Sequence, residues 1–182
     1  MADLIDAKAG QPGCRQLSGF TAVTIRYFAG DRSASEAVQA QGLIWPNVPG
    51  ELSGHDPWLA WRSPQETLAL GFQSDALNAL HALLQALAPG RSESALAVDV
   101  SQALAVFELH GPLLDAWLAH LVDAAAIPRQ AGRVCRCRLA DVAVLLLRLD
   151  PERVYLVADR PIAPYLGNWL AYSHSGAFDA ER

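Results

Sequence analysis

The chain has 182 residues, of which 52% are hydrophobic, and its formal net charge at pH 7 is −5. This length and composition suffice for a sizeable buried core without stabilising disulfides or metals. The 14 basic residues form no run and include a single lysine, so we expect no nucleic-acid partner.

The N-terminal and cysteine patterns predict a cytoplasmic protein. Met1–Lys8 lacks a basic region followed by an apolar one, so no secretory signal is expected. The longest purely apolar run, Val142–Leu147, is far too short to span a bilayer, and no membrane association is predicted. Cys135 and Cys137 point to the same face of a predicted strand and cannot easily bridge each other, which indicates reduced thiols. A zinc site formed by this pair and a histidine is the alternative, although no C-x-x-C or H-x-x-x-H spacing accompanies it.

The N-terminal part of the chain predicts one strand and one short helix after an arm. Residues 1–18 mix Asp, Gly, Gln and Pro without periodicity, which predicts a flexible arm that becomes ordered only against something else. Phe20–Phe28 is rich in β-forming residues and predicts a strand. Ser33 and Glu36 match a capping box, so a helix is predicted to begin at Ser33 and to end at Gly42.

A long loop, a hairpin and a second helix are predicted next. Gly42–Pro57 is rich in Pro and Gly, and loops of this length are usually functional or held by a partner. Trp58–Arg62 and Glu66–Leu70 predict a β hairpin. Ser74 caps a helix that stops at Pro89–Gly90. Its apolar face is formed by Leu77, Leu80, Leu84 and Leu87.

The remainder of the chain predicts antiparallel strands and two helices. The strands are Leu96–Val100, Ala103–Leu109, Val134–Leu139, Val142–Leu149 and Val154–Ala158, with a short turn at Ala140–Asp141. Pro112 and Pro161 each lie in the first turn of a helix. The apolar faces of these helices are Leu114, Trp117, Leu118 and Leu121, and Ile162, Tyr165, Leu166, Trp169 and Leu170. The predicted class is α+β, with antiparallel β-meanders covered by helices and arranged as two small lobes sharing a core.

Short motifs between Trp61 and Leu170 carry a resemblance to a known family. They are W-R-S-P-Q-E-T at Trp61–Thr67, V-D-V-S at Val98–Ser101, E-L-H-G-P at Glu108–Pro112, the turn at Gly132, V-Y-L-V at Val154–Val157 and Y-L-G-N-W-L at Tyr165–Leu170. Their order resembles the folate-binding domain of aminomethyltransferases (the glycine-cleavage T protein), and more closely the gamma subunit of heterotetrameric sarcosine oxidases. The resemblance implies one folate-binding-like domain over residues 19–172, preceded by the arm over 1–18 and followed by a tail over 173–182.

The resemblance implies a non-catalytic, assembly role in a flavin amine oxidoreductase. In that family, alpha and flavin-bearing beta subunits oxidise sarcosine or a related N-methyl amine, and tetrahydrofolate accepts the one-carbon unit. The expected partners are alpha, beta and small delta subunits, which would hold the flavin (FAD or FMN), NAD and tetrahydrofolate. No cofactor is expected in this chain, which has neither a G-x-G-x-x-G nor a P-loop motif. The alternatives are a stand-alone folate-binding one-carbon transferase, using Asp99 or Asp123, and a scaffold for an unrelated partner.

One implied catalytic position falls on alanine. Aminomethyltransferases use an aspartate to orient folate and to stabilise a developing positive charge. The resemblance places that aspartate at Ala124 or Ala125, so Asp123 is displaced by one or two residues. Because catalytic groups must be placed closely, we predict no catalytic residue and interpret Asp123 as a helix-end residue.

Besides Asp123, three further residues are candidates for a folate-like cleft. Asp99 and Ser101 stand two apart between strands and either line a ligand cleft or form a turn that binds free backbone N–H groups. His110, beside Gly111, is a cleft candidate with a turn histidine as its alternative.

Four residues are candidates for a protein interface. Trp45 and Trp58 flank the Pro/Gly-rich loop, and aromatic anchors dominate interface energetics. Arg136 and Arg138 alternate with apolar residues on a strand, and their guanidinium groups suit an acidic partner surface. An ordinary solvated strand face is the alternative for the two arginines.

Overall fold

The chain folds into two compact units. The computed structural model describes residues 3–6, 10–30 and 32–178. Unit 1 comprises Met1–Ser18 and Ala103–Arg182, and unit 2 comprises Gly19–Gln102. Each unit contains an antiparallel sheet and a hydrophobic cluster of its own. The predicted combination of helices with antiparallel sheets is confirmed, whereas the shared core and the domain limits at residues 19 and 172 stay predictions.

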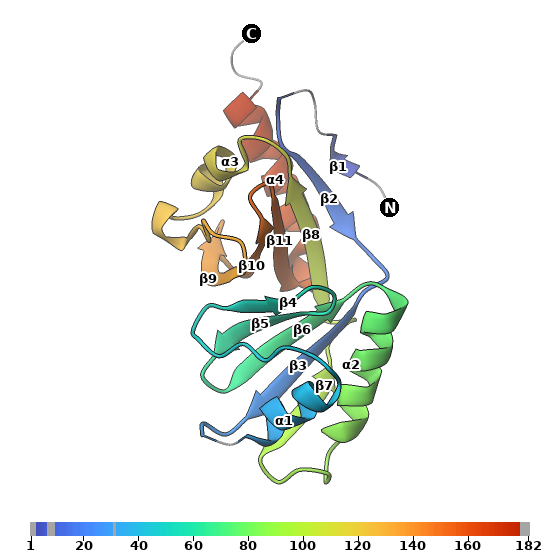
Figure 1. Cartoon of the computed structure of the whole chain (residues 1–182). Helices are drawn as coiled ribbons and strands as arrows, with labels where there is room; N and C mark the ends of the chain where they lie inside the picture. The colour runs from blue at the N-terminus through green and yellow to red at the C-terminus, as the bar shows by residue number, and fades with distance from the viewer. Residues whose placement is uncertain (1–2, 7–9, 31, 179–182) are drawn as a thin grey trace. The chain divides into compact units, whose positions relative to one another are not determined.

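Unit 2 is built on a five-stranded antiparallel sheet with the order β4-β5-β6-β3-β7 (Figure 1). Its strands are β3 (Thr21–Tyr27), β4 (Leu52–Gly54), β5 (Trp58–Ser63), β6 (Glu66–Gly71) and β7 (Ala95–Asp99). The strand predicted over Phe20–Phe28 and the β5–β6 hairpin are therefore confirmed. Alternation along β3 directs Val23 and Ile25 to one face of the sheet, where both are fully buried.

Two helices, α1 (Ser33–Ala40) and α2 (Ser74–Ala86), pack against that face. The cluster between helices and sheet contains Val23, Ile25, Ala34, Val38, Leu59, Ala69, Leu80, Leu83, Leu87, Ala95 and Ala97. Gly42 has φ +72°, the left-handed conformation that favours glycine after a helix, so the predicted end of α1 is confirmed.

Both predicted N-terminal caps are wrong. Arg32 and Gln73 occupy the cap positions of α1 and α2, and neither helix has a side-chain cap bond. The Ser33 hydroxyl instead lies 3.2 Å from that of Ser94, on the far side of α2 in the sequence. Ahead of α2, the carboxylate of Asp56 accepts hydrogen bonds from the backbone N–H groups of Phe72 and Gln73 at 2.8 and 2.9 Å. The distant residue Asp56 therefore binds backbone N–H groups just ahead of α2, whereas the contact between Ser33 and Ser94 joins two hydroxyls and does not cap α1.

The prediction of an uninterrupted loop over Gly42–Pro57 is also wrong. β4 lies inside this segment and pairs with β5. Trp61 donates its backbone N–H to the carbonyl of Glu51 at 2.9 Å, which extends the pairing by one residue. A strand of three residues among prolines and glycines is too short to show a periodic pattern. It is therefore recognised only from its pairing with β5.

Unit 1 is built on a six-stranded antiparallel sheet with the order β1-β2-β8-β11-β10-β9 (Figure 1). Its strands are β1 (Asp3–Ile5), β2 (Gly13–Leu17), β8 (Leu104–His110), β9 (Arg133–Leu139), β10 (Val142–Asp150) and β11 (Arg153–Asp159). The strands predicted in this half of the chain are confirmed. So is the two-residue turn, in which Ala140 and Asp141 have φ values of +47° and +66°.

The prediction of a flexible arm over 1–18 is wrong for its described strands. β2 pairs with β8 along its whole length, and Cys14 is fully buried in the core. The Arg15 guanidinium forms an ion pair with the buried carboxylate of Glu108 on β8. Residues 1, 2 and 7–9 lie outside the described part of the chain. The polar sequence of β2 gives no local strand signal, because its order depends on a strand far along the chain.

Two α-helices, α3 (Leu114–Leu121) and α4 (Ala163–Phe178), cover one face of this sheet. Short 3₁₀ turns at Ala124–Ala126 (η1) and Arg160–Ile162 (η2) follow α3 and precede α4. The apolar face predicted for α3 is confirmed: Leu114, Trp117, Leu118 and Leu121 are all buried.

The structure corrects two predictions about α4. The helix continues to Phe178, so the described residues of the predicted tail over 173–182 are helical, and residues 179–182 lie outside the described part. The buried residues of α4 are Ala163, Leu166, Gly167, Leu170 and His174. Tyr165 and Trp169, predicted to lie on the apolar face, are 50% and 38% exposed. The Trp117 indole N–H donates to Ser173 Oγ at 2.9 Å, and this contact between helices helps set which face of α4 turns inward.

Candidate functional site

The Asp99 and Ser101 side chains bind the local backbone. Asp99 Oδ1 accepts hydrogen bonds from the backbone N–H of Ser101 at 2.8 Å and from its hydroxyl at 2.6 Å. Ser101 Oγ accepts one from the backbone N–H of Ala22 at 2.9 Å. These contacts match the turn alternative, in which both side chains satisfy free N–H groups.

Asp123 and His110 lie in unit 1. Asp123 is exposed and precedes η1, where its Oδ1 accepts a hydrogen bond from the backbone N–H of Ala125 at 2.8 Å. This arrangement agrees with a helix-end residue. His110 closes β8, and its Nδ1 is buried without a hydrogen-bond partner in the described part of the structure.

A hollow of about 420 Å³ lies beside Asp123 but does not include it. Its lining residues are Ala124, Ala125, Ala126, Ile127, Pro128, Arg129, Gln130, Arg133, Val134 and Cys135, so these described residues bring no carboxylate to it. The positions that the resemblance assigns to the folate-orienting aspartate, Ala124 and Ala125, do line the hollow. None of the four cleft candidates lines it, and its residues do not fit the electrostatic role that folate chemistry requires.

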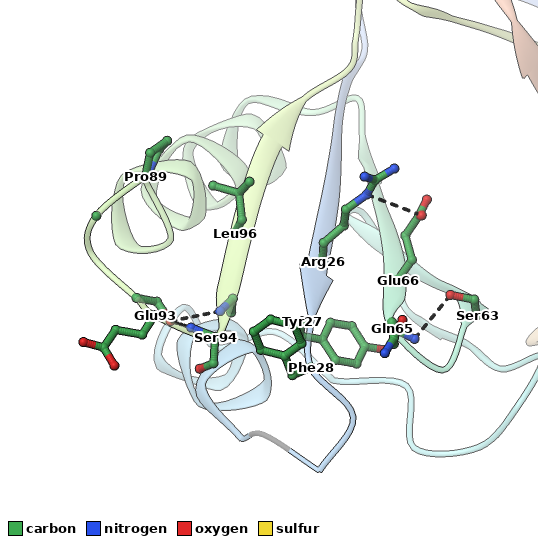
Figure 2. A pocket seen from close by; sticks show the side chains of 13 residues that line it. Arg26, Tyr27, Phe28, Ser63, Gln65, Glu66, Pro89, Glu93, Ser94 and Leu96 are labelled. Carbon is green, nitrogen blue, oxygen red and sulfur yellow. Dashed lines mark hydrogen bonds and ion pairs between the residues drawn. The ribbon is translucent and has the colours of Figure 1, made fainter.

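A second hollow, of about 590 Å³, lies in unit 2 and was not predicted from the sequence (Figure 2). It gathers the end of β3, the β5–β6 turn and the loop before β7, so no single motif could have indicated it. Arg26 and Glu66 face each other in it at 3.7 Å, and Glu66 is held more closely by Arg62 at 2.6 Å. Phe28 and Leu96 add apolar side chains to its lining (Figure 2). The hollow contains none of the predicted site residues.

The surroundings of the two thiols of β9 favour the protonated form. Cys135 and Cys137 are free and partly buried. Burial raises the pKa of Cys135, and burial together with the neighbouring Cys135 raises the pKa of Cys137 to about 12. Among residues 3–6, 10–30 and 32–178, no three His, Cys, Asp or Glu side chains form a group that could hold a metal ion.

We expect iodoacetamide at pH 8 to modify Cys137 at least about tenfold more slowly in the folded protein than in urea, because the thiolate is the reacting form. Mass spectrometry of timed samples measures both rates. The folded protein retains a proton that the unfolded chain releases near the ordinary pKa of 9.0. The stability from this thiol is therefore complete below about pH 9 and is lost as the pH rises toward about 12. Equal rates in both states, or a Cys137→Ala variant with an unaltered alkaline stability profile, would contradict this assignment.

Two of the four interface candidates, Trp45 and Trp58, are half-buried within unit 2. Trp45 is half-buried against the unit 2 cluster and makes an edge contact with Tyr27 at a centroid distance of 5.1 Å. Trp58 is half-buried and meets Phe72 at 6.2 Å. Both tryptophans therefore have aromatic partners within unit 2.

Arg136 and Arg138 are exposed on β9, which is an edge strand of the unit 1 sheet. Arg138 Nη2 donates to the carbonyl of Asp141 at 2.5 Å. The alternation that the sequence predicts on this strand is confirmed, since Leu139 is fully buried and Cys137 packs against the core.

Sequence comparison identified no matching family model and no matching curated protein. Structural comparison gave a match to a chain of heterotetrameric sarcosine oxidase from Corynebacterium sp. U-96, solved in complex with pyrrole 2-carboxylate. The TM-score is 0.79 at 22% identity, and the match covers 95% of this chain and 88% of that one. The chain has the fold of a sarcosine oxidase subunit.

A second match is to the glycine cleavage system aminomethyltransferase T from Bartonella henselae, with a TM-score of 0.60 and 12% identity. It covers 88% of this chain and 45% of the aminomethyltransferase, so this chain corresponds to less than half of that protein's length. The fold resemblance that the motifs predicted is thus confirmed for sarcosine oxidase and aminomethyltransferase alike. No helix in the described part of the chain is both long and apolar enough to cross a membrane.

Proposed function

We propose that this chain is a gamma-like, non-catalytic subunit of a heterotetrameric sarcosine oxidase-type complex. The observation that carries the proposal is the structural match to the sarcosine oxidase chain, which covers 95% of this chain and 88% of that one. The aminomethyltransferase match leaves more than half of that enzyme without a counterpart. A fold that matches 88% of a sarcosine oxidase chain, but only 45% of the aminomethyltransferase, supports the assembly role over the stand-alone enzyme.

The contacts of the cleft candidates support a structural role. Asp99 and Asp123 both bind local backbone N–H groups, and alanine lines the hollow where the resemblance expects a carboxylate. In the proposed complex, alpha, beta and small delta subunits hold the flavin, NAD and tetrahydrofolate. The complex oxidises an N-methyl amine and passes its one-carbon unit to tetrahydrofolate in the cytoplasm, while this chain supports the assembly.

Co-purification tests the proposal. An affinity-tagged copy of the full chain, expressed in its native host, should carry a flavoprotein in near-stoichiometric amount, recognised by flavin absorbance and identified by mass spectrometry. The purified assembly should oxidise sarcosine or a related N-methyl amine. A chain that elutes as a lone monomer from native extract would refute the proposal.

We expect the isolated chain to show no saturable binding of tetrahydrofolate by calorimetry in the micromolar range, which corresponds to about −8 kcal/mol. The physical reason is that Ala124, Ala125 and the other residues lining the hollow supply no carboxylate, while the nearby Asp123 binds the backbone N–H of Ala125. The alternative function, a stand-alone folate-binding transferase, makes the opposite prediction. Micromolar binding that disappears in Asp99→Ala or Asp123→Ala would establish the alternative.

A further inference from the structure

The outer face of α4 carries three exposed aromatic side chains. Tyr165, Trp169 and Tyr172 are 50%, 38% and 72% exposed, and their spacing of four and three residues places them on one side of the helix. The Trp169 and Tyr172 rings lie 5.7 Å apart with an angle of 33° between their planes. The opposite side of α4 packs Leu166 and Leu170 into the core. Because Leu166 and Leu170 hold the other face of α4 in the core, the three aromatic side chains are directed to the surface.

The same helix has no charged residue among its 16 positions. A helix that faces only water carries charged or strongly polar residues on its outer side. Loss of charge with enrichment of Tyr and Trp is instead the composition of an interface centre. Isolated exposed apolar residues are common on protein surfaces, but a contiguous aromatic stripe marks a binding surface.

Positive charge borders this stripe. The Tyr165 hydroxyl donates to the carbonyl of Ala140 at 3.2 Å, and Arg138 Nη2 donates to the carbonyl of Asp141, so both side chains end at the same two-residue turn. Arg136 lies two residues farther from this turn, on the side of β9 opposite the core residues Cys137 and Leu139, so the border is formed by Arg138. Within the described residues neither arginine forms an ion pair, so both guanidinium groups are available for carboxylates.

We propose that the α4 outer face (Tyr165, Trp169 and Tyr172) and Arg138 form the surface that docks onto a partner subunit, at an apolar patch of the partner bordered by carboxylates. This inference rests on the proposed function and names the surface through which the chain would join the complex. Exposed arginine without an internal counter-ion favours an acidic partner. Membrane-surface helices place Lys and Arg on their own polar face, and α4 has neither. Self-association is disfavoured by the net charge of −5 on each copy.

Titration of the purified flavoprotein, freed of this chain, with full-length variants tests the proposal. The double variant Trp169→Ala/Tyr172→Ala should weaken binding about 30-fold or more, the effect typical of central aromatic anchors. Arg138→Glu should weaken binding about tenfold at low salt and less at high salt, because screening reduces the lost attraction. Phe28→Ala, an exposed aromatic residue in unit 2, and Arg32→Glu, an exposed arginine before α1, are matched controls that should bind like the parent.

The outcomes separate this proposal from the proposed function. Variants that melt normally by circular dichroism but bind the flavoprotein weakly, beside unaffected controls, support the docking surface. If the parent chain captures the flavoprotein and both stripe and arginine variants bind as tightly, this proposal fails while the proposed function stands. A parent chain that captures no flavoprotein refutes both. A parent chain that sediments as a dimer, with monomeric Trp169→Ala/Tyr172→Ala, would assign the stripe to a second copy and overturn the partner-subunit docking surface.

Discussion

Replacing Asp115 with alanine is expected to lower the free energy of unfolding by about 3 kcal/mol, since it removes the carboxylate that pairs with a buried guanidinium. Arg148 on β10 is only 1% exposed, and its Nη2 forms an ion pair with Asp115 on α3. Its Nε and Nη1 donate to the carbonyls of Pro128 and Pro151, each at 2.7 Å. Without Asp115 the positive charge stays buried with only these two neutral acceptors. Urea denaturation followed by far-ultraviolet circular dichroism measures the change.

The two partners of this ion pair should respond unequally. Asp115 is 43% exposed, so in Arg148→Met its carboxylate can be hydrated, and we expect a smaller loss than in Asp115→Ala. Arg129 offers a matched control, because it lies 3.9 Å from the other oxygen of Asp115 and is 62% exposed. Arg129→Ala should change stability by less than about 1 kcal/mol, as exposed ion pairs do. The explanation fails if Arg129→Ala is as damaging as Asp115→Ala.

Trp117→Ala is expected to lower the free energy of unfolding by about 3 to 5 kcal/mol, the range for removing a large buried aromatic side chain. Trp117 is fully buried on α3, donates its indole N–H to Ser173 and meets the His174 ring edge-on at 5.3 Å. Its loss leaves a cavity between α3 and α4 and an unused acceptor on Ser173. The same denaturation measurement applies.

Trp169→Ala is the control for this experiment. Trp169 lies on the exposed side of α4, so its removal should cost less than about 1 kcal/mol. Trp117→Phe should recover part of the lost stability because the ring remains while the hydrogen bond does not. Equal destabilisation by Trp117→Ala and Trp169→Ala would mean that α4 presents its other face to the sheet.

Elements with a local pattern were predictable. The α3 face follows helical spacing, and the β9–β10 hairpin has two apolar runs around a two-residue turn, so neither needs information from elsewhere. β2 and β4 depend on partner strands, and their sequences are polar or interrupted by glycine. For α4, the aromatic side with Tyr165 and Trp169 is as apolar as the side with Leu166 and Leu170, and periodicity alone does not decide which of the two sides meets the core.

For the site residues, too, residue types could be recognised from the local sequence, whereas contacts with distant residues could not. Asp99 and Ser101 are recognisable from the sequence as a polar pair, but the deciding contact is with Ala22 N, 79 residues away. Arg148 and Asp115 are 33 residues apart, and nothing in either neighbourhood indicates the pairing. The aromatic stripe had one available signal, the absence of charge across α4, which a periodicity argument does not use.

The pairing of β2 with β8 has a consequence for biosynthesis. Unit 2 is one continuous segment, whereas unit 1 needs both ends of the chain. As the polypeptide leaves the ribosome, all of unit 2 emerges before β8. Until then, the backbone N–H and C=O groups of β2 that later pair with β8 are exposed and can pair with other strands. Translation that stalls within unit 2 would release a chain in which β2 can pair with β1 but lacks β8. The interval before β8 appears is therefore when a nascent chain most needs protection by a chaperone.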